Sequence, residues 1–527
     1  MVLFSQQVAE IRGRVILASM AHMGKKMNQA AHETIRISEL MQSSGVKFGT
    51  SGARGLTADM TDRVCYAYSL AFIQFLEHSG KIVAGAKVAI AGDYRSSSPR
   101  IMAAVAMAVS DAGYQAINCG FIPTPAVALY AMDLNIASIM VTGSHIPDDR
   151  NGIKFYKPEG EVLKSDEQAL SASEVQIATN RFNASGSATQ TYALPAVEQA
   201  AYRLFIQRYL DFFPANCLSG KRIAVYQHST VARDMMAEII EGLGAEVSCL
   251  GRSETFIPVD TEAIRPEDVE LAHQWAVESN FDCIVSADGD GDRPLISDEK
   301  GNWLRGDVAG ILCARYLGAH CVATPVSCNS AVEKSGWFER VDRTRIGSPF
   351  VIAAMDKAIA EGANNVVGYE ANGGFLTATD ITVDGRTLSA LPTRDAIIVP
   401  LMVILLAAQA NVPISGLLAG LPQRFTSSGR LKAFPTELSQ SRLAALNSGD
   451  LNRDLAAAEA LLGSEFGKVT AIDATDGIRV TFASEEVVHL RPSGNAPELR
   501  CYNEAATEVR AMEMNRICMG ILASWRE

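Results

Sequence analysis

The sequence predicts an α/β fold of three or four compact domains, on three observations. The chain has 527 residues, and compact domains contain about 150 residues each. Two segments, 87–120 and 221–251, repeat one order of predicted elements: apolar strand, polar turn, helix and second strand. After residue 422 this order is lost, which favours an α+β end domain. Strands that alternate with helices form parallel sheets covered by helices, so the repeats predict α/β layers.

The two repeats correspond closely to each other. In each, one glycine ends the helix and another ends the second strand, at the same interval (Gly113 to Gly120, and Gly244 to Gly251). A looser third unit follows residue 303, with strands expected at 320–325 and 365–368 around a helix near 350–362. We therefore expect three related units.

The remaining elements follow in order. The longest apolar stretch, 396–408, is interrupted by Pro400 and falls short of the roughly 18 to 20 residues that cross a bilayer, so we expect a buried helix. In the end domain, strands are expected at 424–429 and 469–489, with a helix at 451–462. The first 40 residues have a helical pattern and lack the features of a secretion signal.

Composition excludes several classes of protein. The hydrophobic content of 48% supports packed cores, and the net charge of −12 argues against nucleic-acid or anionic-membrane partners. The ten cysteines are scattered without any CxxC pair, which argues against a disulfide framework or a zinc site. We expect a cytoplasmic protein.

Three aspartates alternate with glycines in SADGDGDRPLI, at Asp288, Asp290 and Asp292. Three carboxylates this close repel one another unless a cation lies between them. Ligation by oxygen alone favours a hard cation, so the pattern predicts a Mg²⁺ site. A calcium EF-hand is excluded, because Arg293 stands where that loop needs glycine and a strand precedes the loop.

The turn TGSHIP, residues 142–147, follows an apolar strand predicted at 137–141 and contains Ser144 and His145. A serine becomes a nucleophile when a base or cation activates it, although Ser-His turns are also common in solvated loops. The hydrolase pattern GxSxG is not met, because Thr142 replaces its first glycine. The nucleotide-binding patterns GxxxxGK[ST] and GxGxxG are absent from the sequence.

Three further turns carry polar side chains suited to a sugar phosphate. RPSGNAPELR, residues 491–500, holds two arginines and turn N–H groups, which suit a phosphate or form a surface turn. In GYEANGG, Glu370 and Asn372 suit sugar hydroxyls or a structural turn. FGTSGARG, residues 48–55, ends in Arg54 and can approach a phosphate closely.

Taken in chain order, FGTSGARG, TGSHIP with NGIKF downstream, DGDGDR, GYEANGG and RPSGNAPELR resemble the motifs of the α-D-phosphohexomutase superfamily across residues 47–504. The resemblance implies four domains around a central cleft: three related mixed α/β units and a smaller α+β C-terminal domain. The expected ranges are 1–40 (helical extension), 41–188 (phosphoserine loop), 189–299 (Mg²⁺ loop), 300–422 (sugar loop) and 423–527 (phosphate loop).

The resemblance also implies roles for the residues of the motifs. Ser144 is expected to carry the transferred phosphoryl group, and to hold Mg²⁺ through it together with the three aspartates. The expected surrounding positive and proton-transferring groups are Arg54, His145, Lys154 and Arg293. Glu370 and Asn372 are expected to bind sugar hydroxyls. The phosphate that is not transferred is expected to contact Arg491, Ser493, Gly494, Asn495 and Arg500.

The implied reaction moves a phosphoryl group between O6 and O1 of a hexose phosphate through a hexose 1,6-bisphosphate. A mannose phosphate is the first expectation and a glucose phosphate the alternative. The chain departs from the usual TASHNP at Gly143 and Ile146, and has Asn372 and Asn495 where Ser and Thr are common. Gly143 and Ile146 leave a third interpretation, a phosphosugar-binding protein without turnover, against which Ser144 and the aspartates argue. A monomer or homodimer is expected.

Overall fold

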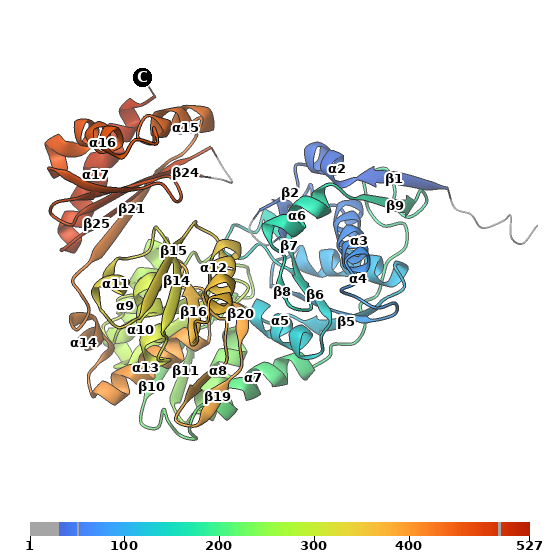
Figure 1. Ribbon diagram of the computed structural model, residues 1–527. Coiled ribbons are helices and arrows are strands. Elements are labelled where there is room, and N and C mark those ends of the chain that lie inside the picture. The colour runs from blue at the N-terminus through green and yellow to red at the C-terminus, as the bar shows by residue number, and fades with distance from the viewer. Residues whose placement is uncertain (1–30, 50–51, 494–496, 527) are drawn as a thin grey trace, which may run out of the picture.

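A computed structural model describes residues 31–49, 52–493 and 497–526 and contains four successive units, each built on its own sheet (Figure 1). Mixed sheets with helices form the first three units, and an antiparallel sheet with helices forms the fourth. This architecture confirms the predicted α/β fold with an α+β end. The helix expected at 396–408 is present as α13 (Ile398–Ala410), and nine of its 13 residues are buried.

The first unit has a seven-stranded sheet in the order β2-β3-β7-β6-β4-β5, with β8 paired to β7. Its elements are β2 (Lys47–Phe48), β3 (Gly52–Leu56), α3 (Asp62–His78), β4 (Lys87–Gly92), α4 (Ser98–Asp111), β5 (Gln115–Gly120), α5 (Thr124–Asp133), β6 (Ala137–Val141), β7 (Arg150–Lys157), β8 (Gly160–Glu161) and α6 (Lys164–Ser171). The predicted strand, helix and strand of residues 87–120 are β4, α4 and β5.

The prediction of a helix over residues 1–40 is wrong for the part that the structure describes before α2 (Ile37–Ser44). Residues 1–30 lie outside the described ranges. Strand β1 (His32–Arg36) pairs antiparallel with β9 (Glu174–Ala178), and Arg36 Nε lies 2.7 Å from Glu174 Oε1. Pairing with a strand far along the chain decided this conformation. We therefore propose that the first domain begins near residue 32.

The second unit has a four-stranded sheet in the order β11-β10-β12-β13, of which only β13 is antiparallel. Its elements are α7 (Ala200–Phe212), β10 (Arg222–Tyr226), α8 (Arg233–Gly242), β11 (Glu246–Leu250), α9 (Pro266–Ser279), β12 (Cys283–Ala287) and β13 (Pro294–Ile296). The second sequence repeat is therefore confirmed as β10, α8 and β11.

The third unit has a five-stranded sheet in the order β15-β14-β16-β17-β20 and a separate hairpin, β18 with β19. Its elements are α10 (Gly306–Tyr316), β14 (Cys321–Pro325), α11 (Ala331–Lys334), β15 (Arg340–Thr344), α12 (Ser348–Ala360), β16 (Val366–Tyr369), β17 (Phe375–Thr377), β18 (Ile381–Val383), β19 (Arg386–Leu388), β20 (Leu391–Asp395), α13 and α14 (Ile414–Ala419). The looser third repeat is therefore present as well.

The fourth unit has an antiparallel sheet in the order β21-β25-β24-β23-β22. Its elements are β21 (Phe425–Leu431), α15 (Thr436–Ala444), α16 (Leu451–Phe466), β22 (Val469–Asp473), β23 (Ile478–Phe482), β24 (Val487–Pro492), β25 (Leu499–Ala505) and α17 (Glu508–Ser524). No helix in the described ranges is both long and apolar enough to span a membrane.

The cores show how the units are joined. One hydrophobic cluster runs without interruption from the first unit through the second and third, whereas the fourth unit has a cluster of its own. In Figure 1 the fourth unit, coloured red, stands above the third and apart from the first. Units without a shared core move more easily relative to one another, so we expect the fourth unit to be the one that shifts.

Each of the first three units has a loop at the equivalent position of its sheet. In each, the loop joins a central parallel strand to the next antiparallel strand: β6 to β7, β12 to β13, and β16 to β17. Ligands of α/β sheets bind outside the carboxyl ends of such strands. Ser144, Asp288 and Glu370 occupy these three loops.

Buried His489 of β24 makes the stability of the fourth unit dependent on pH. Its Nε2–H donates to the Asp476 carbonyl at 2.6 Å, and its ring stacks on Tyr502. Burial lowers the pKa of His489 to about 4, whereas an unfolded histidine has a pKa of about 6.5. Below pH 6.5 the unfolded chain therefore binds a proton that the folded chain does not, and stability falls as pH drops toward 4.

We expect a loss of about 2 kcal/mol from this histidine between pH 7 and pH 5. Thermal unfolding at the two pH values measures it. In His489→Gln, whose side-chain amide can still donate to Asp476, the drop in Tm should shrink. The same substitution at exposed His273 serves as control. An unchanged drop in His489→Gln would refute the assignment.

Candidate active site

Ser144 lies in a tightly held turn after β6. Its φ of 57° is uncommon for a residue other than glycine, and its side chain is fully buried. Its backbone N–H donates to Thr142 Oγ1 at 2.7 Å, and its carbonyl accepts from Arg95 Nη2 at 2.7 Å. The turn is therefore fixed by side chains on both sides of Ser144.

Asp93 and Arg95, which sequence reasoning missed, support this turn. Asp93 Oδ2 accepts from Thr142 Oγ1 at 2.7 Å and from Arg95 Nε at 3.0 Å. Arg95 also donates to the carbonyls of Ile146 and Pro147 and stacks on the ring of Phe256. A signal was present, because both charged residues lie in the polar turn that follows the first predicted strand of the repeat 87–120, observed as β4.

Gly143 leaves the room that the Arg95 guanidinium occupies. A Cβ at this position would lie 2.6 Å from Arg95 Nε, and Arg95 is held by several hydrogen bonds. We expect Gly143→Ala to displace Arg95 and, by misplacing Ser144, to lower kcat of the turnover proposed below by about tenfold or more. Steady-state kinetics measure this. Gly520→Ala on α17, where an added Cβ meets nothing within 4 Å, is the matched control. Unchanged kcat in Gly143→Ala would contradict the expectation.

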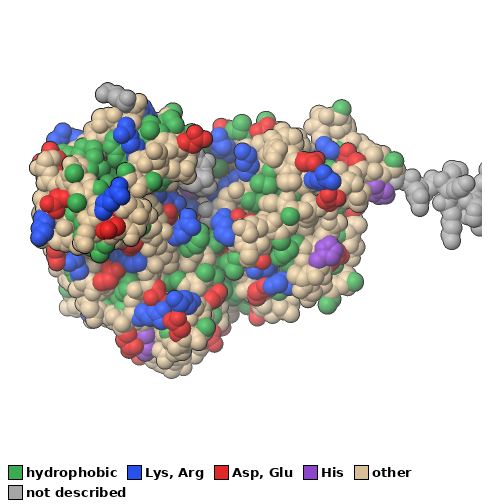
Figure 2. Space-filling view, turned by 45° about the horizontal axis from the view of Figure 1, so that its top comes forward, with side chains coloured by type: hydrophobic (Ala, Val, Ile, Leu, Met, Phe, Trp, Pro, Cys, Tyr) green, Lys and Arg blue, Asp and Glu red, His purple; other side chains and the backbone are tan. Residues whose placement is uncertain are grey.

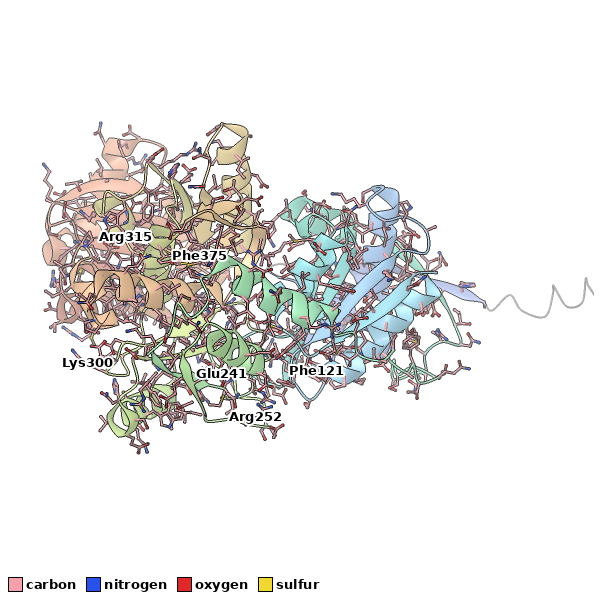
Figure 3. The ribbon with its side chains drawn as sticks, turned by 90° about the horizontal axis from the view of Figure 1, so that it is seen from below. Phe121, Glu241, Arg252, Lys300, Arg315 and Phe375 are labelled. Carbon is pink, nitrogen blue, oxygen red and sulfur yellow. The ribbon has the colours of Figure 1, made fainter. Side chains whose placement is uncertain are left out.

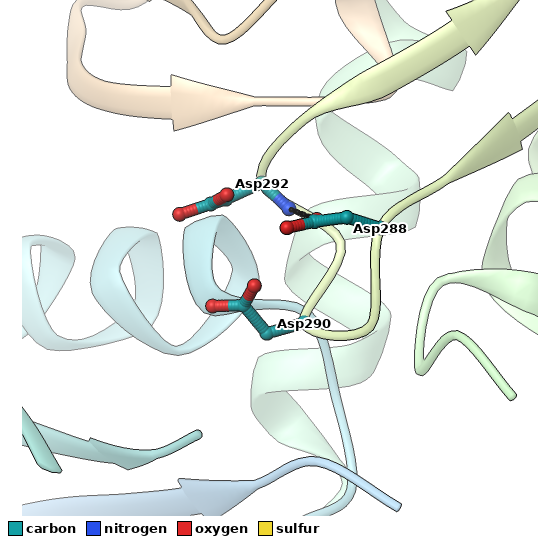
Figure 4. Close-up of side chains that lie close together, drawn as sticks. All are labelled: Asp288, Asp290 and Asp292. Atoms are coloured by element: carbon teal, nitrogen blue, oxygen red, sulfur yellow. Dashed lines mark hydrogen bonds between the residues drawn. The ribbon is translucent and has the colours of Figure 1, made fainter. Parts of the chain in front are cut away.

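The three aspartates converge in the loop between β12 and β13 (Figure 4). All are buried, and one oxygen from each lies within 4.8 Å of the others. The loop curls at Gly291, whose φ is 68°, and Asp288 Oδ1 accepts the backbone N–H of Asp292 at 3.2 Å. The predicted convergence of the carboxylates is therefore present.

Two of the three carboxylates keep one oxygen without a hydrogen bond in the described residues. Asp290 Oδ2 accepts from Lys154 Nζ at 2.6 Å and Thr124 Oγ1 at 2.6 Å, and Asp292 Oδ2 accepts from Lys154 Nζ at 2.5 Å. The Oδ1 atoms of Asp290 and Asp292 are buried without a hydrogen-bond partner in the described part of the chain. Orphaned carboxylate oxygens on a buried acidic cluster fit a hard cation such as Mg²⁺.

Ser144 reaches this cluster directly. Its Oγ donates to Asp288 Oδ2 at 2.7 Å, although the two residues belong to different units. Burial and the neighbouring charges of Asp290 and Asp292 raise the pKa of Asp288 well above its usual range. Burial acts in the same direction on Asp292, but Arg394 and Lys154 outweigh it and hold its pKa well below the usual range.

Cationic groups surround the serine and the aspartates. Arg293 Nη1 donates to His145 Nδ1 at 2.8 Å, and burial, followed by the charge of Arg293, lowers the pKa of His145 well below 6.5. His145 is therefore neutral. Arg54 projects from β3, and burial, then Arg293, lower its pKa to about 10. With Lys154, these side chains make a site suited to a polyanion.

The third loop places Glu370 and Asn372 beside the cluster. Asn372 Oδ1 accepts the Gly374 N–H at 2.9 Å, and its carbonyl accepts from Thr261 of the second unit at 2.7 Å. Its amide N–H groups remain available to a ligand within the described structure. Glu370 Oε2 accepts from Arg394 Nη1 at 3.2 Å. Arg394, which sequence reasoning missed, is an isolated cation before the apolar stretch 396–408.

The fourth loop pairs two arginines across strands. Arg491 of β24 and Arg500 of β25 are direct cross-strand partners, an arrangement that favours a shared anion. Arg491 Nε lies 2.9 Å from Asp476 Oδ2, and Arg500 Nη2 lies 3.4 Å from Glu498 Oε2. Ser493 is buried beside them. Gly494 and Asn495 lie outside the described residues.

Partly buried Glu262 of the second unit interacts with the charges of arginines from three units. Burial and Asp260 raise its pKa, while Arg305, Arg293 and Arg500 oppose that shift. Asp476 of the fourth unit also accepts the backbone N–H of Ile346 in the third at 2.9 Å. The fourth loop is thereby brought toward the other three. Figure 2 shows a hollow between the fourth and first units with Lys and Arg side chains beside it.

Comparison with known proteins relates this chain to one family. Residues 45–181, 305–425 and 441–517 match the models of phosphoglucomutase/phosphomannomutase α/β/α domain I, α/β/α domain III and C-terminal domain. A phosphomannomutase of Sinorhizobium fredii is 45% identical over 88% of this chain and 95% of its own length. A phosphomannomutase of Salmonella muenchen is 42% identical over 89% of this chain and 94% of its own.

Solved structures show the same fold. The putative phosphomannomutase of Thermus thermophilus superimposes with a TM-score of 0.69 at 17% identity, covering 91% of this chain and 99% of that one. A phosphoglucomutase/phosphomannomutase family protein of Burkholderia thailandensis gives 0.66 at 19% identity, covering 90% and 97%.

Proposed function

Because the chain belongs to the phosphoglucomutase/phosphomannomutase family of the α-D-phosphohexomutase superfamily, we propose that it interconverts mannose 6-phosphate and mannose 1-phosphate. The family makes it an isomerase that moves a phosphoryl group on a hexose phosphate. One observation carries the assignment of the site: Ser144 Oγ lies 2.7 Å from Asp288 Oδ2, inside a buried acidic cluster ringed by cations. Relatives at 45% and 42% identity that are named phosphomannomutases favour mannose.

The first half-reaction starts from phosphorylated Ser144. The sugar O1 attacks phosphorus, the bond from phosphorus to Ser144 Oγ breaks, and the O1 proton ends on Oγ. Asp288 Oδ2 accepts the hydrogen bond of the resulting Ser144 hydroxyl. The product is mannose 1,6-bisphosphate.

The cations serve this transfer by positioning and neutralising charge. A Mg²⁺ ion held by Asp288, Asp290 and Asp292 would supply a positive charge beside the transferred phosphoryl oxygens. Lys154 fixes Asp290 and Asp292 through contacts of 2.6 and 2.5 Å. Arg54 and Arg293 would bind the remaining phosphoryl oxygens, and neutral His145 is oriented by its hydrogen bond from Arg293.

The second half-reaction requires the bisphosphate to turn over in the site. Ser144 Oγ then attacks the phosphorus of the 6-phosphate, the bond from phosphorus to O6 breaks, and the Oγ proton ends on O6. Mannose 1-phosphate is released, and Ser144 is phosphorylated again. Two opposite poses need a clamp for whichever phosphate is not reacting, and Arg491, Ser493 and Arg500 on the separately packed fourth unit suit that role. Glu370 and Asn372 would bind the ring hydroxyls in both poses.

Coupled assays on mannose 1-phosphate and glucose 1-phosphate, with Mg²⁺ and a trace of hexose 1,6-bisphosphate, test the proposal. We expect turnover of both, with the higher kcat/KM on mannose 1-phosphate. A higher value on glucose 1-phosphate would make the chain a phosphoglucomutase. No turnover of either would leave a phosphosugar-binding protein. The Ser144→Ala protein, purified in parallel, controls for a contaminating mutase.

A further inference from the structure

Arg394 carries a charge in the interior of the protein at the meeting point of three units. It lies on β20, its side chain is 2% exposed, and Thr393 and Asp395 beside it are buried too. A buried guanidinium is stable only when its donors are paired. Its partners therefore reveal what holds it there.

The guanidinium connects the acidic cluster to the sugar loop. Nε and Nη2 contact Asp292 Oδ2 at 3.1 and 2.9 Å, and Nη1 donates to Glu370 Oε2 at 3.2 Å. Nη1 also donates to Ser348 Oγ at 3.3 Å. A planar fork with several N–H groups is well suited to bind two carboxylates that lie on different loops.

The first unit completes this network. Ser348 Oγ donates to Glu161 Oε2 at 2.9 Å, and Thr393 Oγ1 donates to Glu161 Oε1 at 2.8 Å. Glu161 belongs to β8, which continues the sheet that carries Ser144. Arg394 is thus held from the first unit while it contacts the second and the third.

The loop that carries Glu370 and Asn372 has a glycine, Gly374, where the Arg394 side chain packs against it. A Cβ at Gly374 would lie 2.5 Å from Arg394 Cδ and 3.0 Å from Asn372 Oδ1. The backbone of Gly374 is outside the left-handed region, so its conformation does not require glycine. The absent side chain instead permits the close approach of Arg394.

Arg394 also determines which oxygen of Asp292 is available. Oδ2 is occupied by Lys154 and Arg394, whereas Oδ1 has no hydrogen-bond partner in the described residues. The same guanidinium orients the carboxylate of Glu370. The Arg394 side chain therefore orients both Asp292, which is suited to a cation, and Glu370, which is suited to a sugar hydroxyl.

We propose that Arg394 is a positioning residue that couples cation binding at Asp292 to hexose phosphate binding at Glu370. The proposal rests on the function proposed above. A cation that fixes Asp292 also fixes Arg394 and hence Glu370, so the sugar loop loses less freedom when the substrate binds. By linkage, substrate must then tighten cation binding by the same factor, for which about fivefold or more is expected.

Mn²⁺ binding to the full chain, followed by electron paramagnetic resonance, measures this factor. The dissociation constant is determined with and without saturating 1,5-anhydromannitol 6-phosphate, which lacks the reacting O1 hydroxyl. In the natural protein the analogue should lower the constant about fivefold or more. In Arg394→Lys and Arg394→Met the ratio should approach one, because neither side chain can span both carboxylates.

Arg315→Lys, at an exposed arginine of the same unit (Figure 3), is the matched control and should keep the natural ratio. Adding Glu370→Gln to Arg394→Lys should change the ratio no further. Thermal unfolding verifies that each variant folds. If Arg394→Met does not fold, the ratio measured in Arg394→Lys decides the test. A natural ratio in Arg394→Lys, or no coupling in the natural protein, overturns the proposal. Failure of the proposed function is seen separately, as absent mutase turnover.

Discussion

Ser144→Ala is expected to abolish mutase turnover, with kcat falling by about 10⁴-fold or more, as when other covalent nucleophiles are removed. The substitution deletes the Oγ that lies 2.7 Å from Asp288 and leaves the chain no hydroxyl at that point. The backbone contacts of the turn to Thr142 and Arg95 do not use Oγ, so the fold should persist. Coupled assays measure the rate, and circular dichroism verifies the fold.

Ser138 provides the matched control for this variant. It lies on β6, the strand that leads to Ser144, and its buried Oγ has no hydrogen-bond partner in the described structure. Ser138→Ala should therefore keep its activity. Intact mass should show one phosphoryl group on the natural protein and none on Ser144→Ala. Activity of Ser144→Ala within tenfold of the natural protein would rule out the phosphoserine mechanism.

Asp290→Asn is expected to weaken Mg²⁺ binding and lower kcat by about 100-fold or more. Even the loss of a group that only hydrogen-bonds to a metal ligand lowers metal affinity or activity by about 10- to 100-fold. Asparagine keeps the shape of the side chain but removes the charge of the orphaned Oδ1. The contact of Oδ2 with Lys154 also changes from an ion pair to a weaker hydrogen bond. The dependence of rate on Mg²⁺ concentration measures the effect.

Two comparisons make this result specific. Asp282→Asn changes a carboxylate just before β12 whose partners are Lys221 and the backbone of Arg222, and it should leave the Mg²⁺ dependence unchanged. Chelation with EDTA should remove the activity of the natural protein, and added Mg²⁺ should restore it. Full activity of Asp290→Asn at limiting Mg²⁺, or of the chelated protein, would exclude the cation site.

The local sequence pattern predicted that the three aspartates converge. Asp288, Asp290 and Asp292 are near neighbours in sequence, and glycines between them allow the loop to curl, so their proximity needed no distant contact. The strand before Ser144 and the helix at 398–410 were likewise evident from runs of apolar residues. Such features depend on short stretches of chain, and sequence reasoning succeeds there.

Contacts between distant segments were not foreseen. Thr124, at the start of α5, donates to Asp290 at 2.6 Å from 166 residues away, and Arg95 reaches the Ser144 turn from another loop. Residues 32–36 were expected to be helical but form strand β1. Their partner strand, β9, lies far along the chain, so no local pattern indicated the pairing. A single charged residue has no periodic pattern, so nothing local distinguished Arg394 from an ordinary surface arginine.

The sequence by itself therefore determined the α/β repeats, the acidic loop and the serine turn, because neighbouring residues encode strands, helices and tight turns through their own periodicity and chemistry. Only the tertiary structure decided that Ser144 meets Asp288, and that Arg394 joins Asp292 to Glu370. These contacts arise because three sheets share one hydrophobic core and present equivalent loops to the same space. The packing of whole units, rather than any one segment, sets those distances.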